Sequence, residues 1–126
     1  MTDKTREWLK QAVYDAETAE YMIAGGRYFY AVFMCHLAVE KALKGCYYEK
    51  LGRVPPKVHN LVYLLNEMAI RPPGEIGRFI VRLNEANIAT RHPESLEKVK
   101  AAYTGEAARE ILSKAKEVLR WISDLL

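Results

Sequence analysis

Three ionisable side chains, His36, Glu40 and Lys44, recur at every fourth position in the segment HLAVEKALKG (36–45). In a helix this spacing places them in one row, and a glutamate followed four residues later by a lysine is a favourable pair. The row is either a solvated edge or the polar lining of a groove or dimer seam. Because the rest of this segment is unusually apolar, its exposed strip is expected to be narrow.

The other reactive side chains do not form a recognised catalytic or metal-binding pattern. The three histidines and two cysteines are scattered and lack the spacing of zinc ligands. His36 and Glu40 could share an ion as i and i+4 neighbours, but two more ligands would be needed. The chain has neither a nucleophile elbow nor a glycine-rich phosphate loop. We therefore expect no metal and no cofactor.

Two further groups of polar residues lie near predicted helix ends. Cations are favoured at a helix C-terminus, so Arg91 and His92 have a structural explanation, although Arg91 could also face a phosphate. On the same predicted helix, Arg78 and Arg82 are expected to pair with Glu75 and Glu85. His59 precedes Asn60, and one of these two is expected to cap the next helix.

Apolar side chains at three- and four-residue steps predict the helices that position these groups. Gly25-Gly26, Gly52 and Pro93 act as terminators, and residues 94–103 are expected to be a loop or a single turn. The predicted helices cover residues 3–24, 27–51, 60–70, 75–90 and 104–126. We predict an all-α fold, an antiparallel up-and-down helical bundle of four to five helices, as a single domain over residues 1–126. The first, second and last helices should carry most of the core.

The composition is that of a soluble globular protein. Half of the residues are hydrophobic and the formal net charge is only +3, so the charge alone does not indicate nucleic-acid binding. Cys35 and Cys46 fall in one predicted helix, roughly 16 Å apart, which is too far for a disulfide. With no signal peptide and no membrane-spanning segment expected, the prediction is a cytoplasmic protein.

Several segments, taken in order, resemble a known family. They are GGRYFYAVFMCHLAVEKALKG (25–45), with Ala38, Glu40, Lys41, Leu43 and Lys44 as its core, then VHNLVYLL (58–65) and TRHPES (90–95). Trp8, Ala12, Asp15 and Ala19 fit its first helix, and Tyr103 precedes its last. The chain resembles the HEPN domain family (higher eukaryotes and prokaryotes nucleotide-binding) in its small stand-alone prokaryotic form.

The resemblance implies an antiparallel helical bundle, usually a homodimer. It also implies kinship with the substrate-binding helical domain of some nucleotidyltransferases. Family members often work beside a separately encoded minimal nucleotidyltransferase, frequently as a toxin–antitoxin pair. Many others are metal-independent ribonucleases that carry an arginine, four to six residues, and then a histidine. Such a pair would supply proton transfer at the 2′-hydroxyl of RNA and charge at the scissile phosphate.

This chain departs from the ribonuclease pattern. Arg91 is followed directly by His92, which stands where the family usually has a tyrosine. In a dimer, His92 could supply the catalytic histidine from across the interface. Arg53 and His59 have the formal spacing but lie in a different loop. These four are the only candidate catalytic residues.

We therefore hypothesise a non-catalytic HEPN-type bundle that binds a nucleotide, a partner minimal nucleotidyltransferase, or both. Lysine and arginine would hold phosphate and a glutamate would orient them. The alternatives are a ribonuclease toxin and a purely structural homodimer whose polar stripe is only an interface. The expected ligand groove consists of Glu40, Lys41, Lys44, Arg91 and His92.

Overall fold

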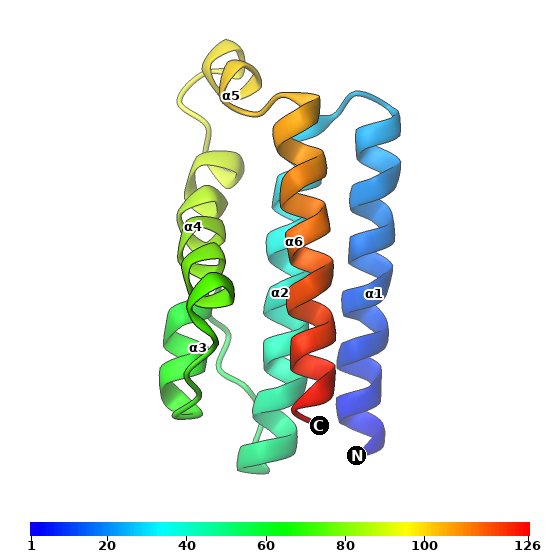
Figure 1. Ribbon diagram of the computed structural model, residues 1–126, viewed down its shortest axis with the longest axis vertical. Coiled ribbons are helices and arrows are strands. Elements are labelled where there is room, and N and C mark those ends of the chain that lie inside the picture. The colour runs from blue at the N-terminus through cyan, green and yellow to red at the C-terminus, as the bar shows by residue number, and fades with distance from the viewer.

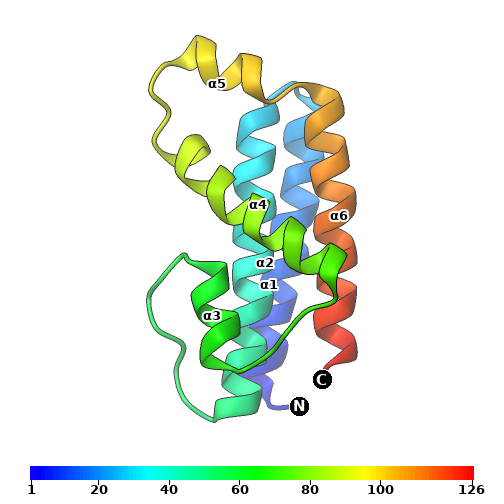
Figure 2. The same cartoon turned by 60° about the vertical axis from the view of Figure 1, so that its left-hand side comes forward.

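The computed structural model describes all residues, 1–126, as six helices without strands (Figure 1). The three long helices α1, α2 and α6 lie side by side, whereas α4 crosses α2 obliquely and α5 lies across one end of the bundle (Figure 2). This arrangement confirms the predicted all-α helical bundle. The helices are α1 Asp3–Ala24, α2 Tyr28–Leu51, α3 Leu61–Glu67, α4 Gly74–Arg91, α5 Leu96–Ala102 and α6 Gly105–Asp124.

The helix count differs from the prediction at α5, in the segment expected to be a loop or a single turn. Ser95 caps this helix, and its hydroxyl accepts a hydrogen bond of 3.1 Å from the backbone N–H of Lys98. Only Val99 of α5 is buried. A seven-residue helix with one buried side chain has almost no apolar period, so its sequence pattern could not reveal it.

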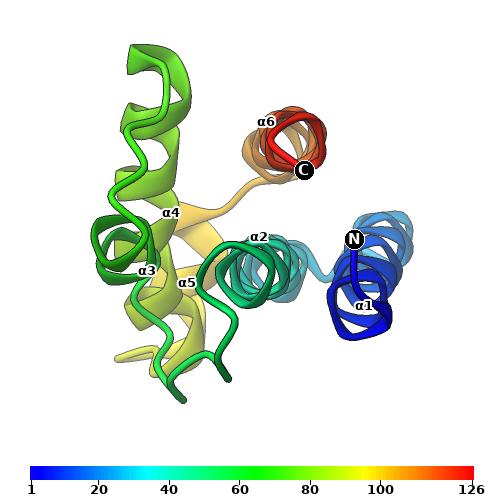
Figure 3. The same ribbon diagram turned by 90° about the horizontal axis from the view of Figure 1, so that it is seen from below.

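Helix α2 is the centre of the molecule. Seen along the bundle, it lies between α1, α6 and the α3–α4 layer (Figure 3), and its buried residues occur on nearly every side of the helix. The approach to α1 is close. A Cβ added at Gly45 would lie 2.9 Å from the Cβ of Trp8, so this position of the interface requires a residue without a side chain. The predicted core of first, second and last helices is therefore present, and α4 adds a further layer.

A small amide network fixes the start of α3. Either His59 or Asn60 was expected to cap this helix, and Asn60 is the N-cap. Its Oδ1 accepts hydrogen bonds from the N–H of Tyr63 at 3.0 Å and from Asn84 Nδ2 at 3.3 Å. In return, Asn84 Oδ1 accepts a hydrogen bond of 2.8 Å from the N–H of Leu61. These bonds tie the beginning of α3 to α4 and thereby position His59, the residue before the cap. No helix in the chain combines the length and apolar character that a membrane span needs.

Candidate functional site

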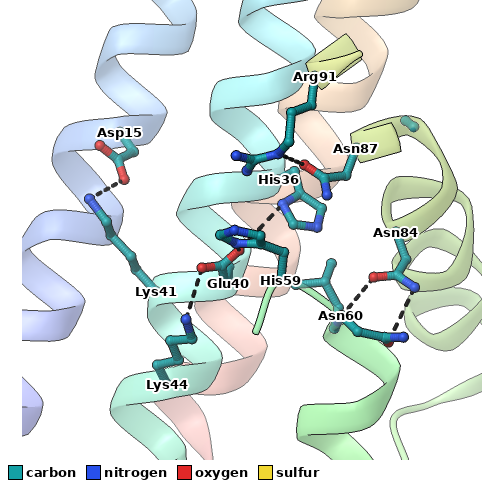
Figure 4. Close-up of polar contacts among 12 residues, drawn as sticks. Asp15, His36, Glu40, Lys41, Lys44, His59, Asn60, Asn84, Asn87 and Arg91 are labelled. Carbon is teal, nitrogen blue, oxygen red and sulfur yellow. Dashed lines mark hydrogen bonds and ion pairs between the residues drawn. The ribbon is translucent and has the colours of Figure 1, made fainter. Parts of the chain in front are cut away.

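The row of ionisable residues on α2 is buried. His36, Glu40 and Lys44 are 1%, 4% and 7% exposed, respectively. The interpretation of this row as a solvated edge is therefore wrong. The face that carries it is the one over which α4 crosses and beside which α3 begins (Figure 4). The sequence pattern cannot give that crossing, because it shows which residues share a face and not which helix covers it.

Glu40 lies at the centre of the polar contacts in this buried row. Its Oε2 accepts a hydrogen bond of 3.0 Å from Lys44 Nζ, and its Oε1 lies 2.9 Å from His59 Nδ1. Since a carboxylate only accepts, the Nδ1–H of His59 is the donor. His36 Nδ1 lies 3.7 Å from the same Oε1. We call His36, Glu40, Lys44, His59 and Arg91 the polar cluster (Figure 4).

His36 is the most buried member of the polar cluster, and neither of its ring nitrogens has a hydrogen-bond partner. Burial lowers its pKa from 6.5 to about 4. Glu40 opposes this shift, whereas the positive charge of Arg91 adds to it. The imidazole of His36 is therefore neutral at pH 7.

Arg91 and His59 are the accessible members of the polar cluster. The side chain of His59 is 51% exposed even though its Nδ1 is bonded to Glu40. Arg91 is half-buried, and its guanidinium carbon lies 4.8 Å from the centroid of the Phe33 ring, in cation–π geometry. Its Nε donates to Asn87 Oδ1 over 3.4 Å. These contacts hold the guanidinium in place on the outer side of the cluster.

The structure brings together only part of the predicted ligand groove. Glu40, Lys44 and Arg91 belong to one cluster, whereas Lys41 points to the other side of α2, where its Nζ lies 2.9 Å from Asp15 Oδ2 of α1 (Figure 4). His92 is exposed just beyond the end of α4 and has no hydrogen bond or ion pair from its side chain.

The pair of Arg53 and His59 is not assembled. The guanidinium of Arg53 lies 5.5 Å from the ring centroid of Tyr47 and 3.9 Å from Glu67, while His59 bonds Glu40. Arg82 pairs with Glu110 of α6 at 3.3 Å rather than with Glu85. No group of three His, Cys, Asp or Glu residues could hold a metal ion.

Sequence reasoning did not find the contact between His59 and Glu40. The two residues are 19 positions apart and meet only because the loop before α3 returns along α2. The available signal was the segment VHNLVYLL, in which a histidine directly precedes the cap of a short helix. That position fixes the histidine in space, but the sequence alone does not say what it faces.

The polar cluster has a definite chemical character. A buried carboxylate that accepts a hydrogen bond from Nδ1 of His59 fixes the orientation of the imidazole ring. Arg91 and Lys44 are basic side chains, and Glu40 is the only acidic member of the cluster. The cluster thus has a net positive charge, with Arg91 and His59 at its accessible side, which suits an anion.

The fold and this cluster define a small helical-bundle protein with a buried carboxylate–histidine pair beside an accessible arginine. A model of the HEPN domain matches residues 5–125, and the chain belongs to the HEPN family. This confirms the resemblance found in the sequence segments.

Solved structures agree with this assignment. The crystal structure of TT1696 from Thermus thermophilus is similar over 99% of this chain and 100% of that one, with a TM-score of 0.85 and 27% identity. The crystal structure of an archaeal HEPN homologue is similar over 98% of both chains, with a TM-score of 0.79 and 28% identity. No curated protein matches the chain.

Proposed function

We propose that this HEPN protein is a non-catalytic binding bundle that takes the phosphate of a nucleotide at the accessible side of the polar cluster. The observation that carries the proposal is the placement of Arg91, from α4, and His59, from the loop before α3, at the accessible side of the polar cluster that contains the buried Glu40 (Figure 4). Arginine offers a planar donor fork that matches phosphate oxygens, and the cation–π contact with Phe33 fixes its position.

Glu40 has an orienting role in this proposal. It bonds His59 and holds Lys44 within the bundle, so Lys44 contributes positive charge without reaching the ligand. The proposed phosphate contacts therefore come from Arg91 and His59. Lys41, engaged by Asp15, and His92, beyond the helix end, take no part in them.

The non-catalytic assignment is supported by the geometry of the candidate pairs. Arg53 and His59 have different partners, and His92 follows Arg91 without the spacing of the ribonuclease motif. Neither pair presents an arginine and a histidine held toward a common point in the way that cleavage of RNA requires.

The partners proposed for this protein come from its family. HEPN proteins often dimerise, and we propose a homodimer in the cytoplasm that works beside a minimal nucleotidyltransferase, as one half of a toxin–antitoxin pair. A purely structural homodimer is the alternative. It would be favoured if Arg91→Ala dissociated the dimer in size-exclusion chromatography while nucleotides had no effect on either variant.

A nucleotide titration tests the ligand. With ATP added to millimolar concentration, the amide signals of residues 36–44, 59 and 91 should shift in wild type. Arg91→Ala should weaken binding about tenfold, the effect of losing one charge-assisted contact. Arg71→Ala, which removes an exposed arginine from the α3–α4 loop, is the matched control and should leave binding unchanged. Unchanged amide signals at millimolar ATP would refute the proposal of nucleotide binding.

One observation favours a second function, ribonuclease activity. The bond between Glu40 and His59 orients an imidazole whose other nitrogen has no hydrogen-bond partner, in the same polar cluster as Arg91 (Figure 4). Incubation of total RNA with the protein in EDTA separates the two functions. Cleavage that disappears in His59→Ala but persists in His92→Ala would establish the ribonuclease and refute the non-catalytic proposal.

A further inference from the structure

A second site lies at the other end of the α2 face, beneath α5. One cavity of about 420 Å³ lies between α4 and α6. A larger, partly open one of about 610 Å³ is lined by the start of α2, by α5 and by the start of α6. Its volume falls in the range of small-molecule sites. The residues that line this cavity, which we call the α5 cavity, are Gly26, Arg27, Tyr28, Phe29, Tyr30, Leu96, Lys100, Tyr103, Thr104 and Gly105.

Aromatic rings dominate the lining of the α5 cavity. Tyr28, Phe29 and Tyr30 come from the first turn of α2, and Tyr103 comes from the segment between α5 and α6. The rings of Phe29 and Tyr30 are in contact, with centroids 4.4 Å apart and planes inclined by 32°. Tyr30 is nonetheless 50% exposed. Such partly open rings offer faces on which a planar ligand can stack.

The ring of Tyr28 is fixed in this arrangement by its packing against the start of α6. A Cβ added at Gly105 would lie 2.9 Å from Cζ of Tyr28, so the ring packs directly on the backbone at the first residue of α6. Only glycine permits this approach. The aromatic wall is thus held against α6, whose N-terminus is capped separately by the hydroxyl of Thr104.

The charges in the α5 cavity are all of one sign. Arg27 and Lys100 line it, no acidic residue does, and neither cation takes part in an ion pair. The α4–α6 cavity differs, because Glu75 and Glu117 line it together with its cations. Unpaired cations beside aromatic faces favour a ligand that is both planar and negatively charged.

We propose that the α5 cavity binds a small aromatic anion, a planar ring that carries a carboxylate or a phosphate. The ring stacks against Tyr30 and Tyr103, and the acidic group is held by Lys100 and Arg27. This site is separate from the polar cluster, and its existence does not depend on the proposed function of that cluster.

Four probes followed by amide chemical shifts test this site. AMP and benzoate supply a ring with a phosphate or a carboxylate, adenosine supplies a ring without an anion, and inorganic phosphate supplies an anion without a ring. AMP or benzoate should shift the signals of residues 27–30 and 100–105, and the one that binds more tightly is the better probe. Adenosine and phosphate should each bind at least tenfold more weakly.

Matched variants assign the binding to the proposed contacts. Lys100→Ala and Tyr30→Ala should each weaken the better probe about tenfold. Their controls, Lys98→Ala on the same helix and Tyr21→Ala at an exposed tyrosine, should change it less than twofold. All four side chains are largely solvent-exposed, so the variants should fold.

Three results would overturn the proposal for the α5 cavity. One is the absence of shifts at residues 27–30 and 100–105 with both ring-bearing anions at millimolar concentration. The second is equal binding of adenosine or of phosphate alone. The third is equal weakening by Lys100→Ala and Lys98→Ala. The first result, together with shifts at residues 36–44, 59 and 91, would support binding at the polar cluster, so the two proposals fail separately.

Discussion

Replacing Glu40 with alanine should destabilise the protein strongly. The side chain of Lys44 is only 9% exposed, and its Nζ has no other acidic partner than Oε2 of Glu40, at 3.0 Å. Glu40→Ala leaves that ammonium buried without a counterion and removes the acceptor of His59. Breaking one partner of a buried pair costs about 3–5 kcal/mol. Against a typical total of about 5–15 kcal/mol, such a loss is a large part of the free energy of unfolding.

Two controls separate the buried charge from other effects of the substitution. The double variant Glu40→Met/Lys44→Met removes both charges and keeps the side-chain length, so it should lose far less stability, about 0–2 kcal/mol. Glu94→Ala breaks an ion pair with the same four-residue spacing to Lys98, but both of those side chains are exposed. It should therefore change the free energy of unfolding too little to resolve.

The measurement is urea unfolding at pH 7, followed by circular dichroism at 222 nm. Wild type, Glu40→Ala, the double methionine variant and Glu94→Ala are compared at equal protein concentration. A loss below about 1 kcal/mol in Glu40→Ala, similar to that in Glu94→Ala, would refute the reasoning. It would mean that water reaches Lys44 and that the polar cluster is not a dry interior.

Three further predictions concern other buried positions. Burial lowers the pKa of His36 from its ordinary value of 6.5 to about 4 in the folded protein. The stability contributed by its neutral form is therefore complete above pH 6.5 and decreases as the pH drops toward 4. Wild type should lose about 2 kcal/mol relative to His36→Gln between pH 7 and pH 5 in urea unfolding, and a constant difference would contradict the burial of His36. Gly45→Ala should lower the free energy of unfolding by about 1–3 kcal/mol, because the added Cβ would lie 2.9 Å from the Cβ of Trp8. Its control is Gly77→Ala in α4, where the added Cβ meets only ordinary van der Waals contacts, so thermal unfolding should change little. Burial raises the pKa of Cys35 to about 12, so iodoacetamide should label it at pH 8 only after denaturation, and labelling of the native protein by mass spectrometry would be the contrary result.

The long helices were predictable because each has a strong local signal. Apolar residues at three- and four-residue steps, with Gly25-Gly26 and Gly52 at the ends, gave α1 and α2 to within one residue. Helix α5 had no such signal. It is held by the cap at Ser95 and by the burial of Val99, which is a tertiary contact and not a sequence period.

The candidate site was predictable only as a set of residues on one helix. Glu40 and Lys44 differ by about 40° around the helix, so they share a face, whereas Lys41 is rotated by about 100° from Glu40. That geometry explains why Lys41 reaches Asp15 on α1 and Lys44 bonds Glu40. Grouping Lys41 with Glu40 followed the motif in the sequence rather than the helical period.

The burial of the row, by contrast, required knowledge of the fold. A helix that is apolar on most sides is surrounded, and a surrounded helix has no solvated edge for Glu40 to occupy. The sequence showed an apolar helix with a narrow polar strip, but it did not show which element covers that strip. What it could not supply was the partner, since His59 reaches Glu40 through a loop whose path depends on Asn60 and Asn84.

Stability alone does not account for a charged cluster at the centre of this bundle. A buried ion pair is usually no more stabilising than apolar residues of similar size. If the double methionine variant at Glu40 and Lys44 folds as expected, the bundle does not need these charges in order to form. Their effect then lies in where they hold His59 and in the positive potential that they leave beside Arg91. A double variant that folds but no longer binds ATP would separate the ligand role of the polar cluster from its structural role.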